Sequence, residues 1–166
     1  FVVAGAGAIV AKHGNRAASS RCGSADVLEA LGVNINLKPE EVTLCLQEAS
    51  IGFMFAPLFH PSMKYAGPVR REIGIRNVFN ILGPLTNPAG AKRQVLGVPG
   101  AENAAKLAAV LQQLGSEHAL VVHSADGLDE ISIAAESYIY EVRGSTPIRE
   151  HVIIPEDFGI KRAAAN

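Results

Sequence analysis

The strongest constraint on the fold is a strand–helix–strand pattern in residues 94–124. The apolar segment QVLGV (94–98) predicts a strand, and AENAAKLAAVLQQLG (101–115) predicts an amphipathic helix that ends at Gly115. HALVVHS (118–124) then predicts a buried strand. Two strands joined by a helix favour parallel pairing with a right-handed crossover, so this part of the chain predicts an α/β sheet.

The beginning of the chain predicts the end of a helix, a strand and a second helix. Phe1 to Ala6 is apolar and stops at Gly7, and residues 9–12 follow as a short buried strand. The segment SADVLEALG then predicts a helix that Ser24 caps and Gly32 ends.

Residues 38–76 differ from both flanks, because they contain no convincing strand. Pro39 and the two acids after it begin a predicted helix that runs to Ala49. A further helix fits between Pro61 and Gly74. We therefore expect helical material inserted into an α/β fold.

Composition and charge exclude several classes of partner. The 166 residues carry 15 Lys and Arg against 16 Asp and Glu, so no overall basic field attracts nucleic acid or an anionic membrane. No apolar run is long enough to span a bilayer. Cys22 and Cys45 form neither a CxxC motif nor a disulfide framework, which favours a reducing cytoplasm. A small-molecule partner is the favoured expectation.

The loop KHGNRAASS, directly after the first predicted strand, collects groups that suit phosphate. Lys12 supplies a positive charge, and Gly14 allows close approach of the backbone. Hydroxyl side chains follow near the start of the next helix, at Ser19, Ser20 and Ser24. Asn15 offers both a donor and an acceptor to a second, uncharged or amphoteric group. The alternative is a solvated turn that only connects strand to helix.

Two adjacent carboxylates, Asp129 and Glu130, lie in the loop HSADGLDEIS after the strand at 118–124. Adjacent acids are poorly placed to bracket one atom as a general acid and base, but they suit a hard divalent cation held partly through water. We expect Mg²⁺ beside pyrophosphate. A solvated surface pair is the alternative.

A third segment, GPVRREIGIRNVFNILGPLTNPAG (67–90), contains arginines and a turn-rich tract. Arg70 and Arg71 could clamp a carboxylate or a phosphate, although solvated helix arginines would give the same pattern. The tract NILGPLTNP predicts a rigid loop with a structural role.

Together, KHGNRAASSRCGSADVLEALG, GPVRREIGIRNVFNILGPLTNPAG and GLDEIS resemble the anthranilate phosphoribosyltransferases in order and spacing. The resemblance implies transfer of the phosphoribosyl group of phosphoribosyl pyrophosphate (PRPP) to anthranilate, which gives N-(5-phosphoribosyl)anthranilate and pyrophosphate in tryptophan biosynthesis. The alternatives are a pyrimidine-type nucleoside phosphorylase and a non-catalytic homologue of the same fold. The phosphorylases would be expected to have a serine-glycine-arginine tract where this chain has HGNR.

The resemblance also implies a set of binding residues. PRPP would contact Lys12, His13, Gly14, Asn15, Arg16, Ala17, Ala18, Ser19, Ser20 and Ser24. Anthranilate would contact Asn15 and Arg70, and its route would be lined by His13, His60 and Pro57. Asp129 and Glu130 would hold Mg²⁺. No residue is expected to act as a covalent nucleophile, because positioning and charge stabilisation suffice for this transfer.

The implied fold is an α/β domain, with a parallel sheet and helices on both faces, joined to a small α-helical domain. It is the nucleoside phosphorylase/phosphoribosyltransferase type, with substrates at the hinge. Residues 38–76 would be helices of the small domain, and 1–37 and 77–166 the first and second parts of the α/β domain. Asn77 stands where the family usually has threonine. A cytoplasmic homodimer is expected, with no nucleic-acid or membrane partner.

The chain is expected to be an internal fragment of a longer protein. It begins without Met, and the family's GTGGD pyrophosphate loop, the N-terminal helical domain and the C-terminal part are missing from it. We therefore expect little activity from these residues alone.

Overall fold

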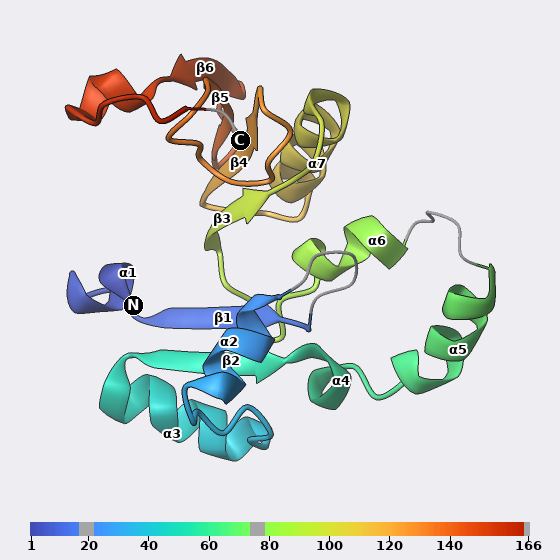
Figure 1. The fold of residues 1–166 in the computed structure, drawn as a ribbon. Helices are drawn as coiled ribbons and strands as arrows, with labels where there is room; N and C mark the ends of the chain where they lie inside the picture. The colour runs from blue at the N-terminus through green and yellow to red at the C-terminus, as the bar shows by residue number, and fades with distance from the viewer. Residues whose placement is uncertain (17–21, 74–78, 165–166) are drawn as a thin grey trace. The chain divides into compact units, whose positions relative to one another are not determined.

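The computed structural model describes residues 1–16, 22–73 and 79–164. It divides into two compact units, Phe1–Gly90 (unit 1) and Ala91–Asn166 (unit 2). Unit 1 has a two-stranded sheet and unit 2 has a four-stranded sheet, each with helices beside it (Figure 1). The predicted α/β class is therefore confirmed.

Unit 1 is built on two parallel strands, β1 (Val10–Gly14) and β2 (Ile51–Phe55), with Gly14 opposite Phe55. The other elements of unit 1 are α1 (Val2–Gly5), α2 (Ser24–Ala30), α3 (Pro39–Ala49), α4 (Ala56–Phe59), α5 (Met63–Ile73), α6 (Phe79–Leu82) and the 3₁₀ turn η1 (Gly83–Leu85). Helix α3 packs directly on β2, because a Cβ on Gly52 would come within 2.9 Å of the Val42 side chain. A glycine in the strand thus lets helix and sheet approach closely.

Strand β2 corrects the expectation that residues 38–76 contain no strand. The segment IGFMF is a short, continuous apolar run, and such a run fits a buried strand as well as a piece of helix. Pairing with β1 decides for the strand, so the purely helical interpretation of this segment is wrong. Its assignment to a small helical domain stays a prediction.

Unit 2 contains the predicted strand–helix–strand pattern. Strands β3 (Arg93–Gly97) and β4 (His118–Ser124) are parallel, and α7 (Ala101–Gln113) connects them. The sheet continues with two antiparallel strands, in the order β3-β4-β5-β6, and is therefore mixed. The added elements are β5 (Ser137–Arg143), β6 (Arg149–Ile153) and the 3₁₀ turn η2 (Pro155–Phe158).

Unit 2 has an apolar core between its helix and its sheet. Helix α7 buries the face formed by Ala104, Leu107, Ala108 and Leu111, a spacing of three and four residues, against β4 and β5. From the strands, the core receives Ala119, Val121, Val122, Ile139 and Val142, each at most 2% exposed. The helix and sheet of unit 2 therefore cover each other's apolar surface.

Unit 2 also contains a buried carboxylate, Glu141 on β5. Its Oε1 lies 2.8 Å from His118 Nε2 and 2.7 Å from Arg143 Nη2. These hydrogen bonds, the His118 one first, hold the pKa of Glu141 below its usual value.

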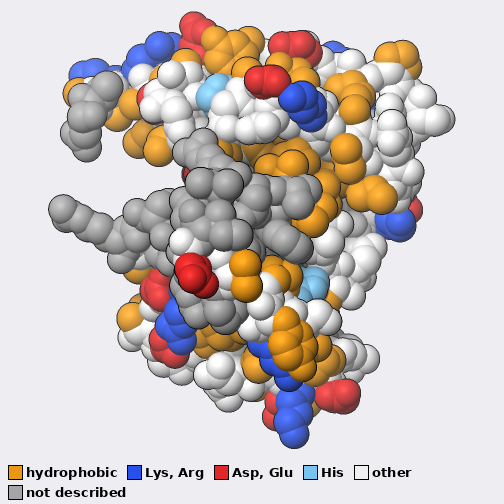
Figure 2. Space-filling model, turned by 90° about the vertical axis from the view of Figure 1, so that its right-hand side faces the viewer, with side chains coloured by type: hydrophobic (Ala, Val, Ile, Leu, Met, Phe, Trp, Pro, Cys, Tyr) orange, Lys and Arg blue, Asp and Glu red, His pale blue; other side chains and the backbone are white. Residues whose placement is uncertain are grey.

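The apolar core of unit 1 is smaller. Ala25, Ile35 and Phe55 form one cluster with Leu28 and Phe53 against it. Many large apolar side chains of unit 1 are exposed, among them Leu31, Leu44 and Tyr65. Figure 2 shows hydrophobic side chains, in orange, lying among charged ones on the face it presents.

Candidate functional site

The carboxyl ends of β1 and β2 bring the first group of predicted site residues together. Parallel strands end at the same edge of a sheet, and α4 begins at the residue after β2. His13 of β1 and His60, which follows α4, therefore meet with their Nε2 atoms 3.1 Å apart. The two rings pack edge to face, with centroids 5.0 Å apart. Pro57 lies in α4 and is exposed.

The surroundings of His13 favour its neutral form. Burial lowers its pKa most, and His60 and then Lys12 lower it further, whereas a backbone hydrogen bond with Gly83 acts in the opposite direction. Because Nε2 faces His60, we assign the Gly83 hydrogen bond to Nδ1–H. The bare Nε2 of His13 then accepts a hydrogen bond from His60 Nε2–H.

The turn-rich tract NILGPLTNP is tied to β1. Asn87 Nδ2 donates to the Ala11 carbonyl at 3.1 Å, and Asn87 Oδ1 accepts from the Ala89 N–H at 2.9 Å. Together with the Gly83 hydrogen bond to His13, these contacts fix the tract beside the strand end. This agrees with the structural role predicted for it.

Gly14 allows α2 to approach the end of β1. A Cβ at this position would lie 3.1 Å from the Phe53 ring and 3.3 Å from Ser24 Oγ. The expectation that Ser24 caps α2 is wrong: Gly23 occupies the cap position, and its N–H donates to Asp26 Oδ2 at 2.8 Å. Ser24 is instead the first helical residue, close to the strand end.

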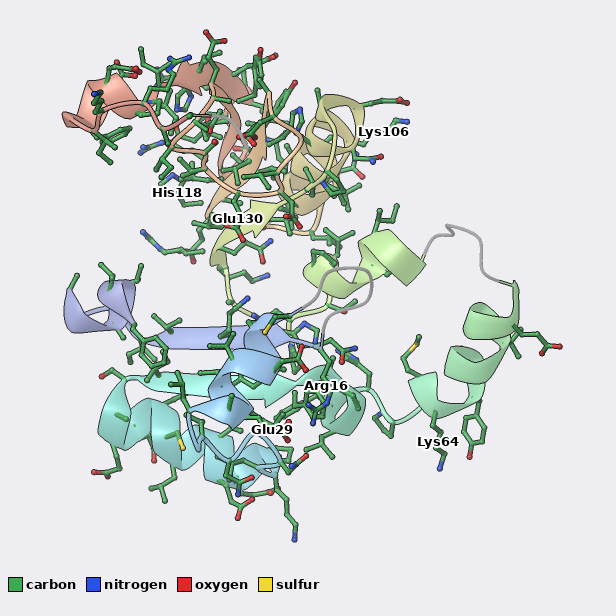
Figure 3. The ribbon with its side chains drawn as sticks, viewed as in Figure 1. Arg16, Glu29, Lys64, Lys106, His118 and Glu130 are labelled. Atoms are coloured by element: carbon green, nitrogen blue, oxygen red, sulfur yellow. The ribbon has the colours of Figure 1, made fainter. Side chains whose placement is uncertain are left out.

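Arg16 is held by carboxylates of α2. Its guanidinium makes two hydrogen bonds to Glu29, at 2.5 and 2.9 Å, and a longer one to Asp26 at 3.4 Å (Figure 3). This pairing raises the pKa of Arg16 and lowers that of Glu29. A phosphate at Arg16 would therefore compete with Glu29. The backbone N–H of Arg16 donates to Asn15 Oδ1, and the Asn15 NH2 group makes no hydrogen bond to any described residue.

Several predicted residues lie outside the described part of the chain, namely Ala17, Ala18, Ser19, Ser20 and Asn77. Arg70 and Arg71 lie on α5, but their side chains are not described. Lys12 is on β1 with an exposed side chain. The roles implied for these residues stay predictions.

Asp129 and Glu130 lie in the loop between β4 and β5 of unit 2, and both are exposed. Figure 3 shows Glu130 next to β3. Among residues 1–16, 22–73 and 79–164, no hydrogen bond or ion pair engages either carboxylate, so both remain available to a ligand. Because Lys12 and Asn15 belong to unit 1, the convergence of the two loops on one pyrophosphate stays a prediction.

Asp126 is the residue of this loop that sequence reasoning missed. Both of its oxygens accept hydroxyl hydrogen bonds, one from Ser124 Oγ and the other from Ser132 Oγ at 2.6 Å. These bonds, Ser124 first, lower the pKa of Asp126. The sequence does show Ser124 and Ser132 near Asp126, but only the folded loop places both hydroxyls within hydrogen-bonding distance of its carboxylate.

The donor set of the loop fits Mg²⁺. Within the described ranges, no group of three or more His, Cys, Asp or Glu residues could hold a metal. Magnesium does not need such a group, because it commonly takes one or two carboxylates together with water and substrate phosphates. The adjacent carboxylates of Asp129 and Glu130, which have no partner among the described residues, would meet that requirement.

Comparison with known proteins confirms the resemblance noted in the sequence. The chain is 63% identical over 163 residues to the anthranilate phosphoribosyltransferase of Herpetosiphon aurantiacus, covering 98% of this chain and 48% of that protein. The crystal structure of anthranilate phosphoribosyltransferase from Thermus thermophilus is 51% identical with a TM-score of 0.88, over 98% of this chain and 47% of that one.

A more distant structure has the same fold with ligands bound. It is anthranilate phosphoribosyltransferase from Saccharomyces cerevisiae in complex with PRPP and Mg, 27% identical with a TM-score of 0.85, over 94% of this chain and 42% of that one. The chain thus spans about half the length of the curated relatives it matches. No described helix is long and apolar enough to cross a membrane.

The family described as the a/b domain of a glycosyl transferase family matches residues 1–166, the whole of the sequence. The fold, with its parallel strand pairs and the loops at their carboxyl ends, agrees with this match. The chain belongs to this glycosyl transferase family.

Proposed function

We propose that the protein containing this chain transfers the phosphoribosyl group of PRPP to anthranilate, giving N-(5-phosphoribosyl)anthranilate and pyrophosphate in tryptophan biosynthesis. The observation that carries the proposal is the 63% identity to an anthranilate phosphoribosyltransferase over 98% of the chain. The likeness to a yeast enzyme in complex with PRPP and Mg supports both the substrate and the ion.

In this proposal, the end of β1 binds PRPP. Lys12 offers an ammonium group, and Gly14 leaves room for the Ser24 hydroxyl at the same strand end. The loop from Asn15 to Ser20 continues the contact. The close approach of Ser24 Oγ to Gly14 supports this role, since both groups were implied as PRPP contacts.

Anthranilate enters beside the paired histidines. His13, whose pKa is lowered, favours the neutral imidazole and so adds no second positive charge beside Lys12. Arg70 would pair with the benzoate carboxylate, and the Asn15 amide with the amine or carboxylate edge. Pro57 in α4 would line the same route.

Asp129 and Glu130 hold Mg²⁺, which supplies charge stabilisation on the departing pyrophosphate when it is bound. The amine of anthranilate attacks C1 of the ribose as pyrophosphate leaves, and no covalent enzyme intermediate is needed. The chain's residues therefore act by orienting the two substrates and by neutralising charge.

We further place the protein in the cytoplasm as a homodimer. The sequence has only Cys22 and Cys45, which form neither a CxxC motif nor a disulfide framework, and this supports a reducing compartment. The homodimer follows from the family resemblance, with helices of the small domain as its contact. Size-exclusion chromatography with light scattering tests the dimer directly.

A substrate panel on the complete polypeptide that carries residues 1–166 tests the activity. We expect anthranilate consumption that needs both PRPP and Mg²⁺, and no phosphate-dependent cleavage of pyrimidine nucleosides. Nucleoside cleavage without a response to anthranilate would instead support the phosphorylase alternative. Asp129→Asn should abolish most turnover, and an unchanged rate would contradict the metal assignment. The 166 residues alone should show little activity.

A further inference from the structure

The loop between β4 and β5 contains a third carboxylate, Asp126, whose oxygens are already engaged. We propose that Asp126, Ser124, Ser132 and Gly97 form a brace that holds the Asp129–Glu130 segment in position to bind Mg²⁺. In this loop brace, Asp126 is a positioning residue and not a metal ligand. The inference rests on the proposed function and deepens it, because it says what fixes the geometry of the metal-binding pair.

The first part of the loop brace is a hydrogen-bond bridge across the loop. Ser124, the last residue of β4, is fully buried, and Ser132 is 5% exposed. Asp126 accepts from both hydroxyls, so its carboxylate joins two buried points on either side of the Asp129–Glu130 segment. Charge-assisted bonds of this kind are stronger than bonds between neutral groups.

Backbone hydrogen bonds anchor each end of the bridge. At one end, the Ser124 N–H donates to the Leu128 carbonyl at 3.1 Å. This hydrogen bond holds Leu128, the residue before Asp129, at the end of β4. At the other end, Ser132 Oγ accepts from the Ala134 N–H at 2.9 Å, and the Ser132 N–H donates to Ser137 Oγ at 2.9 Å. These anchors hold the residues on either side of the Asp129–Glu130 segment.

The second part of the loop brace is steric and independent of the hydrogen bonds. A Cβ on Gly97, the last residue of β3, would lie 1.6 Å from the Asp129 carbonyl oxygen and 2.8 Å from its carbonyl carbon. Real Cβ atoms do not approach backbone atoms this closely, so any side chain at position 97 must push the Asp129 backbone away. Gly97 therefore lets the metal-binding pair lie against β3.

The three acids of this loop have different hydrogen-bond partners, and we infer different roles from them. The oxygens of Asp126 are engaged by Ser124 and Ser132, whereas the carboxylates of Asp129 and Glu130 have no hydrogen-bond or ion-pair partner in the described ranges. Metal sites depend on outer groups that orient the ligands, and losing such a group commonly costs ~10–100-fold in metal affinity or activity.

The test compares three variants of the complete polypeptide with two matched controls. Asp126→Asn and Ser132→Ala break the bridge, and Gly97→Ala displaces the segment by the steric route. Ser145→Ala, in the turn after β5, and Gly5→Ala, where a Cβ meets nothing within 4 Å, are the controls. Gly97→Ala keeps the proposal testable if a bridge variant fails to fold.

Two measurements separate positioning from general stability. Hydrogen exchange should accelerate in residues 125–136 of the bridge variants while the amides of 118–122 keep their rates. At saturating PRPP, the Mg²⁺ concentration for half-maximal rate should rise roughly tenfold in all three variants, with KM for anthranilate unchanged. Both controls should match the unmodified protein in each measurement.

Three results would overturn the loop brace. One is a Mg²⁺ requirement within about twofold of normal in Ser132→Ala and Gly97→Ala, because the magnitude expected of an orienting group is larger. Another is a lower Mg²⁺ concentration for half-maximal rate in Ser132→Ala together with a loss of activity in Asp126→Asn. This combination would make Asp126 a metal ligand. The third is faster exchange throughout β4 and β5, which would indicate a purely structural role. If Asp129→Asn itself leaves the Mg²⁺ requirement unchanged, the proposed metal site fails instead.

Discussion

The two units of this chain solve the problem of burying apolar surface in different ways. Unit 2 packs a helix of 13 residues against a four-stranded sheet and buries apolar side chains of both. Unit 1 has a two-stranded sheet with helices of 4 to 11 residues, and among the described residues it buries fewer apolar side chains than unit 2 and exposes more of them. Yet unit 1 contains the paired histidines and the predicted PRPP loop. The unit with the richer set of candidate binding groups is therefore the one with less core to hold them.

The largest expected difference is in independent folding. A sheet of two strands is marginal in water, whereas several strands covered by a helix form a stable core. Residues 91–166 expressed alone should give a cooperative thermal transition by circular dichroism, and residues 1–90 alone should not. If the two segments melted with equal cooperativity, the comparison between the units would fail.

A matched pair of helix leucines sharpens the comparison at single-residue scale. Leu107 on α7 is 3% exposed, and Leu44 on α3 is 57% exposed. Because both are helical, changing each to Ala alters helix propensity alike, and only burial differs. Leu107→Ala should lower the free energy of unfolding by ~2–5 kcal/mol, measured with urea on the 166-residue chain.

Leu44→Ala should change the free energy of unfolding by less than ~0.5 kcal/mol, as is usual for exposed sites. A large loss at Leu44 would mean that the exposed face of α3 is covered in solution. That outcome would contradict the statement that unit 1 leaves many apolar side chains exposed, which is half of the contrast between the units.

The smallest expected effect is a difference in acid sensitivity. The pKa of His13 lies below its ordinary value of 6.5, so the unfolded chain takes up this proton first as the pH falls. Stability from a neutral His13 is therefore complete above pH 6.5 and declines below it. The pKa of Glu141 lies below 4.5, so its contribution to unit 2 is complete above pH 4.5 and is lost only in stronger acid.

Between pH 6.5 and pH 4.5, the sheet of unit 1 should therefore lose stability before the sheet of unit 2 does. Amide protection factors, measured by NMR across this range, should fall in β1 and β2 while those in β4 and β5 hold. His13→Asn should reduce the pH dependence of unit 1 only. A simultaneous loss in both sheets would contradict the assignment to His13.

The elements and site residues that could be predicted from the sequence were those whose pattern lies within a few neighbouring residues. The strand–helix–strand pattern of unit 2 was recoverable, because each segment shows its period within its own residues. Strand β2 was not, since the segment IGFMF, with Pro57 two residues after it, carries no period, and only pairing with β1 defines it as a strand. Asp129 and Glu130 were noticed because they are adjacent in sequence.

Site residues that depend on spatial neighbours were harder. His13 and His60 were named through the family resemblance, but their contact required knowing that β2 ends beside β1. Asp126 was passed over because its partners Ser124 and Ser132 gather only in the folded loop. Gly97 gave no signal at all, because a tight approach between β3 and a loop 32 residues later leaves no mark in the sequence.

The direct junction between β2 and α4 has a mechanical consequence. Phe55 ends the strand and Ala56 begins the helix, so no spare residue can absorb movement between them. His60 directly follows this four-residue helix, so its ring lies five residues after the end of β2, where it meets the His13 ring. The thickness of a planar molecule, rather than its length, would then decide whether it can slip between the two rings.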